Sequence, residues 1–120
     1  MAVLEHGGNA FDAAVAMGFA LQVVEPHMNG PAGEVPALFR KASSAEIGVL
    51  SGQGPAPAKA TPQAYRDLGL DRVPGTGMLP LVVPGAFDAW MTLLRDHGTM
   101  KPRDVLKYAI GYARDGFAIA

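Results

Sequence analysis

An apolar stretch near the start of the chain is interrupted only by Asp12 and Gln22. Asn9 can cap a helix at its beginning, Asp12 places a carboxylate in the first turn, and Pro26 ends the run, so the pattern predicts a helix over 9–24. A helix that is apolar on nearly all sides is expected to be buried on nearly all sides. The pattern therefore indicates a piece of a larger protein, or a chain that oligomerises.

Two short apolar runs follow, at about 34–40 and 46–51, and the polar residues 41–45 join them, which predicts a β-hairpin. Pro36 would keep the first strand at a sheet edge or introduce a bulge. A Gly- and Pro-rich loop comes next, then a short helix over 62–68 and another long connection. Loops of this length in a compact domain usually carry function or lie over a neighbouring part.

Apolar residues recur at helical spacing in the last third of the chain and predict helices over 85–97 and 102–115. The short connection between them predicts that the two helices pack as a hairpin. The first contributes Phe87, Trp90, Met91 and Leu94, and the second contributes Val105, Leu106, Ala109, Ile110 and Ala113. Together the elements predict an α+β fold, mostly helical with one β-hairpin.

Composition narrows the classes of function. Half of the 120 residues are hydrophobic (49%) and the net charge is −1 without a basic cluster, which favours one folded domain and argues against nucleic-acid binding. No cysteine is present and the histidines are scattered, so we expect no metal and no cofactor. Neither a membrane span nor a signal-peptide pattern is visible. The chain reads as cytoplasmic, and a removed leader would make it periplasmic or secreted.

Few residues offer chemistry by themselves. Ser51 lacks the G-x-S-x-G frame of a hydrolase and a histidine marked as its base. The glycine pairs at 52 and 54 and at 75 and 77 lack the lysine of a phosphate-binding loop. His27 and Asn29 follow the first helix, where left-handed capping by Asn or Gly explains them adequately and function is the minor alternative.

A family resemblance carries the interpretation further. The segments "GGNAFDAAVA", "VVEPHMNGPAG", "VPGAFDAW" and "ARDGF", in this order, resemble the N-terminal part of the large subunit of the γ-glutamyltransferase (γ-glutamyltranspeptidase) family. The resemblance implies an N-terminal-nucleophile hydrolase with a four-layer αββα sandwich, made as a precursor that cuts itself into two subunits. It also implies that residues 1–120 are an N-terminal fragment whose partners are the rest of the large subunit and the small subunit.

The same resemblance bears on the site. The nucleophile of the family is the N-terminal threonine of the small subunit, so no catalytic residue is expected in this chain. His27, Asn29, Gly30 and Gln53 are the expected substrate-binding residues, because they fall in segments that line the cavity of the family for a small amide or γ-glutamyl substrate. The resemblance implies a carboxylate-binding arginine after the second strand and just before an "AP" pair, but this chain reads "SGQGPAPAKAT" there, without an arginine. The loop "HMNGPAG" is more similar to the amidohydrolase or acylase-like branch.

Two functions of different classes remain open at this stage. One is a scaffold and cavity-wall fragment of a γ-glutamyltransferase-like enzyme, inactive when isolated. The other is a stand-alone, non-catalytic module or relic that associates with itself through its first helix. The side of that helix expected to require cover is formed by Phe11, Val15, Phe19 and Val23.

Overall fold

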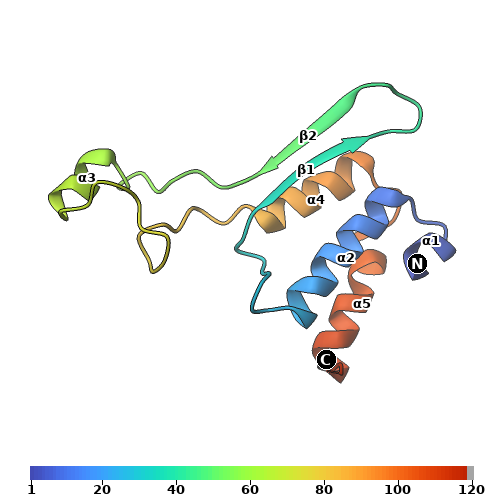
Figure 1. The fold of residues 1–120 in the computed structure, drawn as a ribbon. Coiled ribbons are helices and arrows are strands. Elements are labelled where there is room, and N and C mark those ends of the chain that lie inside the picture. The colour runs from blue at the N-terminus through green and yellow to red at the C-terminus, as the bar shows by residue number, and fades with distance from the viewer. Residues whose placement is uncertain (119–120) are drawn as a thin grey trace.

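The structure is a computed structural model that describes residues 1–118. Its helices and strands follow the sequence-based boundaries within one or two residues, apart from a short first helix that the pattern did not predict (Figure 1). In chain order they are α1 (Ala2–Glu5), α2 (Ala10–Val24), β1 (Val35–Arg40), β2 (Ile47–Gly52), α3 (Pro62–Asp67), α4 (Ala86–His97) and α5 (Pro102–Asp115). Among the described helices, none is long and apolar enough to cross a membrane.

Helix α2 begins with the predicted cap. The Asn9 Oδ1 atom accepts hydrogen bonds from the N–H groups of Phe11 (2.8 Å) and Asp12 (3.0 Å). In return the Asp12 carboxylate accepts one from the Asn9 N–H at 2.7 Å. This reciprocal pair is a capping box, which satisfies N–H groups that the helix itself leaves without acceptors.

Asp12 also joins the start of α2 to the connection between α4 and α5. Its carboxylate is fully buried and accepts hydrogen bonds from the Thr99 hydroxyl (2.7 Å), the Thr99 N–H (3.0 Å) and the Met100 N–H (3.1 Å). Burial alone would raise the pKa of this carboxyl, but the hydrogen bonds from Asn9, Thr99 and Met100 outweigh it and hold the pKa below its usual value. Asp12 is therefore a charged structural anchor inside the helical layer.

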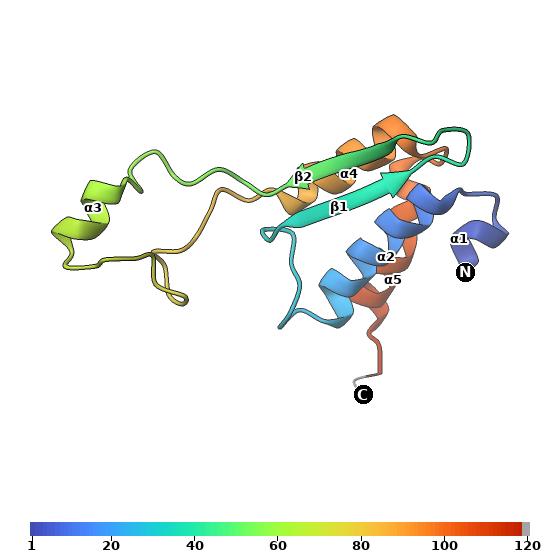
Figure 2. The same cartoon turned by 45° about the horizontal axis from the view of Figure 1, so that its top comes forward.

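The prediction that α4 and α5 pack against each other as a hairpin is wrong. Helices α4 and α5 each pack against α2 and contact one another little (Figure 2). The reason lies in the connection, because its N–H groups are bound by Asp12 and α5 therefore starts beside α2. A close contact between helices forms at Gly18, where an added Cβ would lie 2.6 Å from the indole ring of Trp90.

The side of α2 expected to require an external partner is also covered within the chain. Val15 is fully buried, and Phe11 and Phe19 pack against the same core. The exposed apolar residues of α2 are instead Met17 (61% exposed) and Leu21 (37%). On α5, Val105 and Ala109 are buried as expected, whereas Ile110 from the predicted apolar face is exposed.

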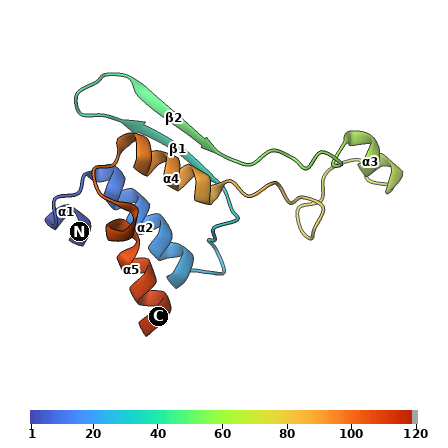
Figure 3. The ribbon, with the colours of Figure 1, turned by 180° about the vertical axis from the view of Figure 1, so that it is seen from behind.

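The two strands form an antiparallel hairpin over α4 (Figure 3). In its register Val35 lies opposite Gly52, Leu38 opposite Val49 and Arg40 opposite Ile47. Val35 faces the helices with Ala86 and Ala89 of α4. The other face, which we call the outer hairpin face, presents Leu38, Ile47 and Val49 with 75%, 68% and 72% of their surface exposed.

Between β2 and α4 the chain leaves this body as a projecting arm, residues 54–84, which carries α3 at its far end (Figure 1). The described chain measures 55 × 40 × 22 Å and its radius of gyration is 17.5 Å. A compact domain of this length would have a radius of gyration of about 14 Å. The projection of the arm accounts for the difference.

Candidate functional site

The loop between α2 and β1, residues 25–34, carries three of the four expected substrate-binding residues. The His27 Nε2 atom lies 3.5 Å from the Glu25 carboxylate, and both side chains are more than half exposed. The Asn29 Oδ1 atom accepts a hydrogen bond from the adjacent Gly30 N–H at 2.9 Å. These side chains are held by their own loop and are otherwise open to solvent.

Left-handed capping does not explain Asn29 and Gly30. Neither residue has a positive φ, and an added Cβ at Gly30 would meet nothing within 4 Å. Helix α2 ends at Val24 and is followed by a tight turn, in which the Glu25 carbonyl accepts hydrogen bonds from the Met28 and Asn29 N–H groups. The turn therefore forms without a residue of positive φ, and the interpretation as left-handed capping is wrong.

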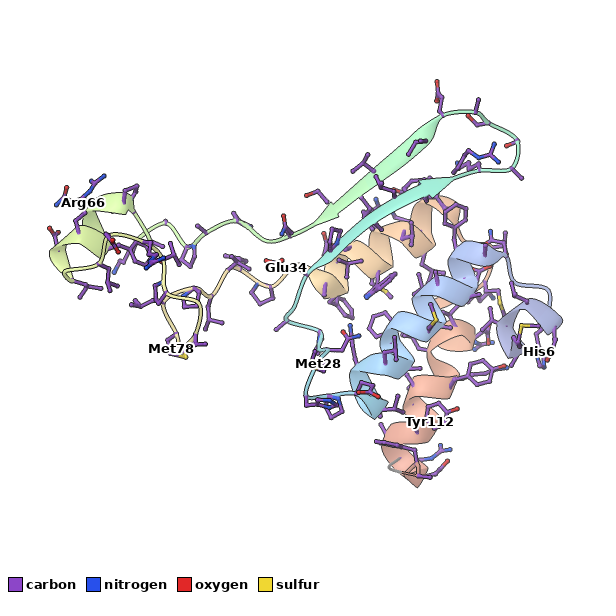
Figure 4. The ribbon with its side chains drawn as sticks, in the orientation of Figure 1. His6, Met28, Glu34, Arg66, Met78 and Tyr112 are labelled. Atoms are coloured by element: carbon purple, nitrogen blue, oxygen red, sulfur yellow. The ribbon has the colours of Figure 1, made fainter. Side chains whose placement is uncertain are left out.

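Gln53, the fourth expected residue, lies at the base of the hairpin. Its amide Nε2 donates a hydrogen bond to the Glu34 carboxylate at 2.9 Å, which ties the end of β2 to the end of the 25–34 loop. In Figure 4 the labelled Glu34 lies where the loop, the hairpin and the arm meet, and Met28 lies in the part of the loop nearer to α2. Among the described residues, no hydrogen bond joins Gln53 to His27 or Asn29.

Backbone contacts fix this junction. The Gly33 carbonyl accepts hydrogen bonds from the N–H groups of Gly85 (3.3 Å) and Ala86 (2.9 Å) at the start of α4. A Cβ at Gly85 would lie 2.5 Å from the Gly52 carbonyl oxygen, so only glycine lets the start of α4 approach the end of β2 this closely. The base of the hairpin is thus a rigid meeting point of three segments, with Glu34 and Gln53 exposed upon it.

The charge at this junction is negative. Residues 1–39 contain no lysine or arginine, and neither does the segment from Gln53 to Ala58. Glu34 supplies a carboxylate there, and Glu25 lies at the other end of the 25–34 loop. A substrate carboxylate placed beside Gln53 would therefore meet a glutamate and no cation of the loop or the hairpin base.

Other candidates for chemistry stay apart from this junction. Ser51 is exposed on the outer hairpin face beside Pro36, and no histidine bonds to it among residues 1–118. A hollow of about 750 Å³ lies at the opposite end of the hairpin, where Phe11, Phe39 and His97 cluster with ring centroids 4.6–5.4 Å apart. Within the described part of the chain, no three potential metal ligands come together.

The model of the gamma-glutamyltranspeptidase family matches residues 1–120. The chain belongs to this family. The acylase ACY 1 proenzyme of Pseudomonas sp. (strain SE83) is 38% identical over 98% of the chain, which corresponds to 22% of that protein. Family members similar to this chain also include proteins named as glutathione hydrolases and an oxamate amidohydrolase, so the family comprises hydrolases as well as transferases.

Solved structures similar to this chain share its fold. LmbA2991HD is 69% identical, with a TM-score of 0.87 over 93% of this chain and 19% of its own. Gamma-glutamyltranspeptidase from Helicobacter pylori is 37% identical, with a TM-score of 0.88 over 99% of this chain and 35% of its own. This chain spans about a fifth of the length of the curated relatives that it matches.

The structure gives two residues of this gamma-glutamyltranspeptidase-family chain contacts that the sequence analysis does not predict, Glu34 and Asp12. Glu34 falls at the start of the first predicted strand, and its hydrogen bond with Gln53 becomes visible only in the fold. Asp12 was recognised as a first-turn residue of α2, but its bonds to residues 99 and 100 are long-range. No local pattern announces a partner that distant in sequence.

Proposed function

We propose that the full-length protein is an N-terminal-nucleophile enzyme that cleaves or transfers an amide-linked acyl group. Its nucleophilic threonine would lie outside residues 1–120, in a small subunit released when the precursor cuts itself. Residues 1–120 would belong to the N-terminal part of the large subunit, providing scaffold and one wall of the substrate cavity. Membership of a family whose relatives are named as proenzymes supports this proposal.

The architecture proposed for the whole protein is the αββα sandwich. In this chain one layer of helices covers one face of the hairpin, and the outer hairpin face is bare. Leu38, Ile47 and Val49 are the side chains that a second sheet would cover, and burying such side chains stabilises by about 1.5–3 kcal/mol each. The bare face supports a second sheet supplied by the remainder of the protein.

The proposed substrate-binding residues are His27, Asn29, Gly30 and Gln53, with Glu34 added. The observation that carries this assignment is the hydrogen bond from Gln53 to Glu34 on a junction that backbone contacts make rigid. A rigid junction with exposed polar groups is suited to orienting a bound acyl group. In this proposal the 25–34 loop forms the rim and Gln53 with Glu34 contact the substrate.

The acyl group bound there would lack a free carboxylate at this position. Gln53 donates its amide to Glu34 instead of presenting a cation, and a bidentate carboxylate clamp requires a guanidinium. We therefore place the enzyme with the amidohydrolases and acylases of the family rather than with γ-glutamyl-specific transferases. Hydrolysis of simple acyl amides is the expected main activity.

The test compares two anilides of equal chain length on the full-length enzyme, one γ-glutamyl and one lacking the α-carboxylate. The wild type should turn over the second with the higher kcat/KM. The Gln53→Arg variant should gain on the γ-glutamyl anilide by on the order of tenfold, because a hydrogen bond to a charged group is worth roughly 1.5–3 kcal/mol. A wild type that prefers the γ-glutamyl anilide would refute this specificity.

A non-catalytic interaction module is the second candidate, and the outer hairpin face is the observation in its favour. An exposed apolar sheet face is a common site of protein association. Amide turnover by the full-length protein distinguishes the enzyme from the interaction module, because a module would turn over no anilide. Turnover that is lost with the small-subunit threonine would exclude the module.

A further inference from the structure

The arm has no partner within the described chain. None of its residues belongs to the two buried clusters, and α3 makes no substantial contact with another helix or strand. Figure 3 shows α3 well away from the layer formed by α2, α4 and α5. The arm nevertheless exposes large apolar side chains, including Leu68 (62%), Met78 (80%) and Leu81 (52%). Exposed apolar side chains gathered on one projecting segment indicate an interaction surface.

These side chains line a groove of about 400 Å³ between α3 and the segment 78–81. Most of its lining is apolar, and Lys59 is the charged residue among the lining residues. Lys59 takes part in none of the ion pairs of the part of the chain that the structure describes. The groove thus fits an apolar segment that carries an acidic side chain.

The arm has a definite shape of its own. The Tyr65 hydroxyl donates a hydrogen bond to the Leu79 carbonyl at 2.7 Å, which holds α3 against the 78–81 segment. At the root, the Val83 N–H donates to the Pro55 carbonyl at 3.0 Å. A Cβ at Gly54 would lie 1.5 Å from the Val83 carbonyl oxygen, so this crossing requires glycine. A groove built by such contacts exists before any partner arrives.

The projection is also found in a longer protein. The match to the Helicobacter pylori enzyme has a TM-score of 0.88 over 99% of this chain, so it includes the arm. That solved chain is longer, since the match covers only 35% of it. The arm therefore keeps its direction where additional chain is available to contact it.

We propose that the arm is a docking clamp for a segment of the same polypeptide that lies beyond residue 120. The occupant is an apolar segment with an acidic residue facing Lys59. About four-fifths of the length of the matched relatives lies outside this chain, and a tethered segment binds at a high effective concentration. A second copy of the chain would have to bind without that advantage. This proposal concerns assembly and does not depend on the substrate proposed above.

Photo-crosslinking in the full-length protein tests the proposal. A benzophenone amino acid is placed at Leu68, inside the groove, and at Gln63, which lies on the same helix and outside the groove lining. We expect Leu68 to crosslink to a peptide from beyond residue 120 of the same polypeptide, and Gln63 to give none. Crosslinks from Leu68 to a second copy, to another protein or only within the arm would overturn the proposal, as would the absence of any crosslink.

A second measurement needs no substitution. Met78 is 80% exposed in this chain, and so is Met28 in the 25–34 loop. In native full-length protein, peroxide should oxidise Met78 far more slowly than it does after unfolding, as peptide mass spectrometry would show. Met28 serves as a second reporter of a surface outside the arm. Oxidation of Met78 at the same rate in native and unfolded protein would contradict the clamp, whatever the activity on amides.

Discussion

At the scale of single residues, Asp12 combines three tasks in one carboxylate. It completes the cap of α2, binds the connection between α4 and α5, and remains ionised while fully buried. A buried charge is tolerated only when its hydrogen bonds are complete, and here four donors from Asn9, Thr99 and Met100 surround it. Its removal should therefore affect the whole helical layer.

We expect Asp12→Asn to lower the free energy of unfolding of the full-length protein by about 3 kcal/mol, because hydrogen bonds to a charged group are worth roughly 1.5–3 kcal/mol each. The matched control is Asp88→Asn, a first-turn aspartate of α4 that is exposed. The control should change the free energy by less than about 0.5 kcal/mol. Urea titrations of both variants make the comparison, and equal effects would show that Asp12 is not an anchor.

The pH dependence of stability follows from the same carboxylate. Because the pKa of Asp12 is lowered in the folded protein, its contribution is fully present above the usual aspartate pKa of about 3.9 and is lost as the pH falls through the folded value. The difference in stability between wild type and Asp12→Asn should therefore shrink below about pH 4. A difference that stays constant down to pH 2 would contradict the charged state of Asp12.

At the scale of elements, local sequence signals predicted where the helices and strands begin and end. Contacts between residues distant in sequence determined how the helices pack on one another. Asn9, Pro62 and Pro102 mark helix starts through cap and φ preferences that need no tertiary partner, so their helices could be predicted from the sequence. The placement of α5 on α2 depends on Asp12 reaching residues 99 and 100, which spacing does not reveal. The four expected substrate-binding residues rest on the resemblance and stay a prediction, whereas the hydrogen bond from Gln53 to Glu34 could be seen only in the fold.

The packing of α2 on α4 gives a further prediction. Gly18→Ala should destabilise the protein by about 1–3 kcal/mol, since overpacking a core costs that much and the added Cβ would lie 2.6 Å from Trp90. Gly111→Ala is the control, because this α5 glycine has open space around its Cβ position. Alanine there should be neutral or stabilise by roughly 0.5–1 kcal/mol. The midpoint temperature of thermal unfolding should fall for Gly18→Ala and should stay the same or rise for Gly111→Ala.

At the scale of the whole molecule, residues 1–118 leave two apolar surfaces uncovered, the outer hairpin face and the arm. Residues 1–120 in isolation should therefore self-associate through the outer hairpin face. The isolated fragment should also hydrolyse no anilide. Val49→Lys should weaken that association in sedimentation experiments, while Ser51→Lys, on the same strand and face beyond the apolar cluster, should weaken it less. A wild-type fragment that stays monomeric at high concentration would contradict this expectation.

We propose above that these residues belong to the N-terminal part of the large subunit of a self-cutting, amide-cleaving enzyme. The most direct test of this proposal is N-terminal sequencing and intact-mass measurement of the purified full-length protein. We predict two fragments, the larger containing residues 1–120 and the smaller beginning with threonine, and we predict that replacing this threonine by alanine leaves one uncut and inactive chain. An uncut protein that turns over amides, or a cut whose new end is not a nucleophile, would contradict the account.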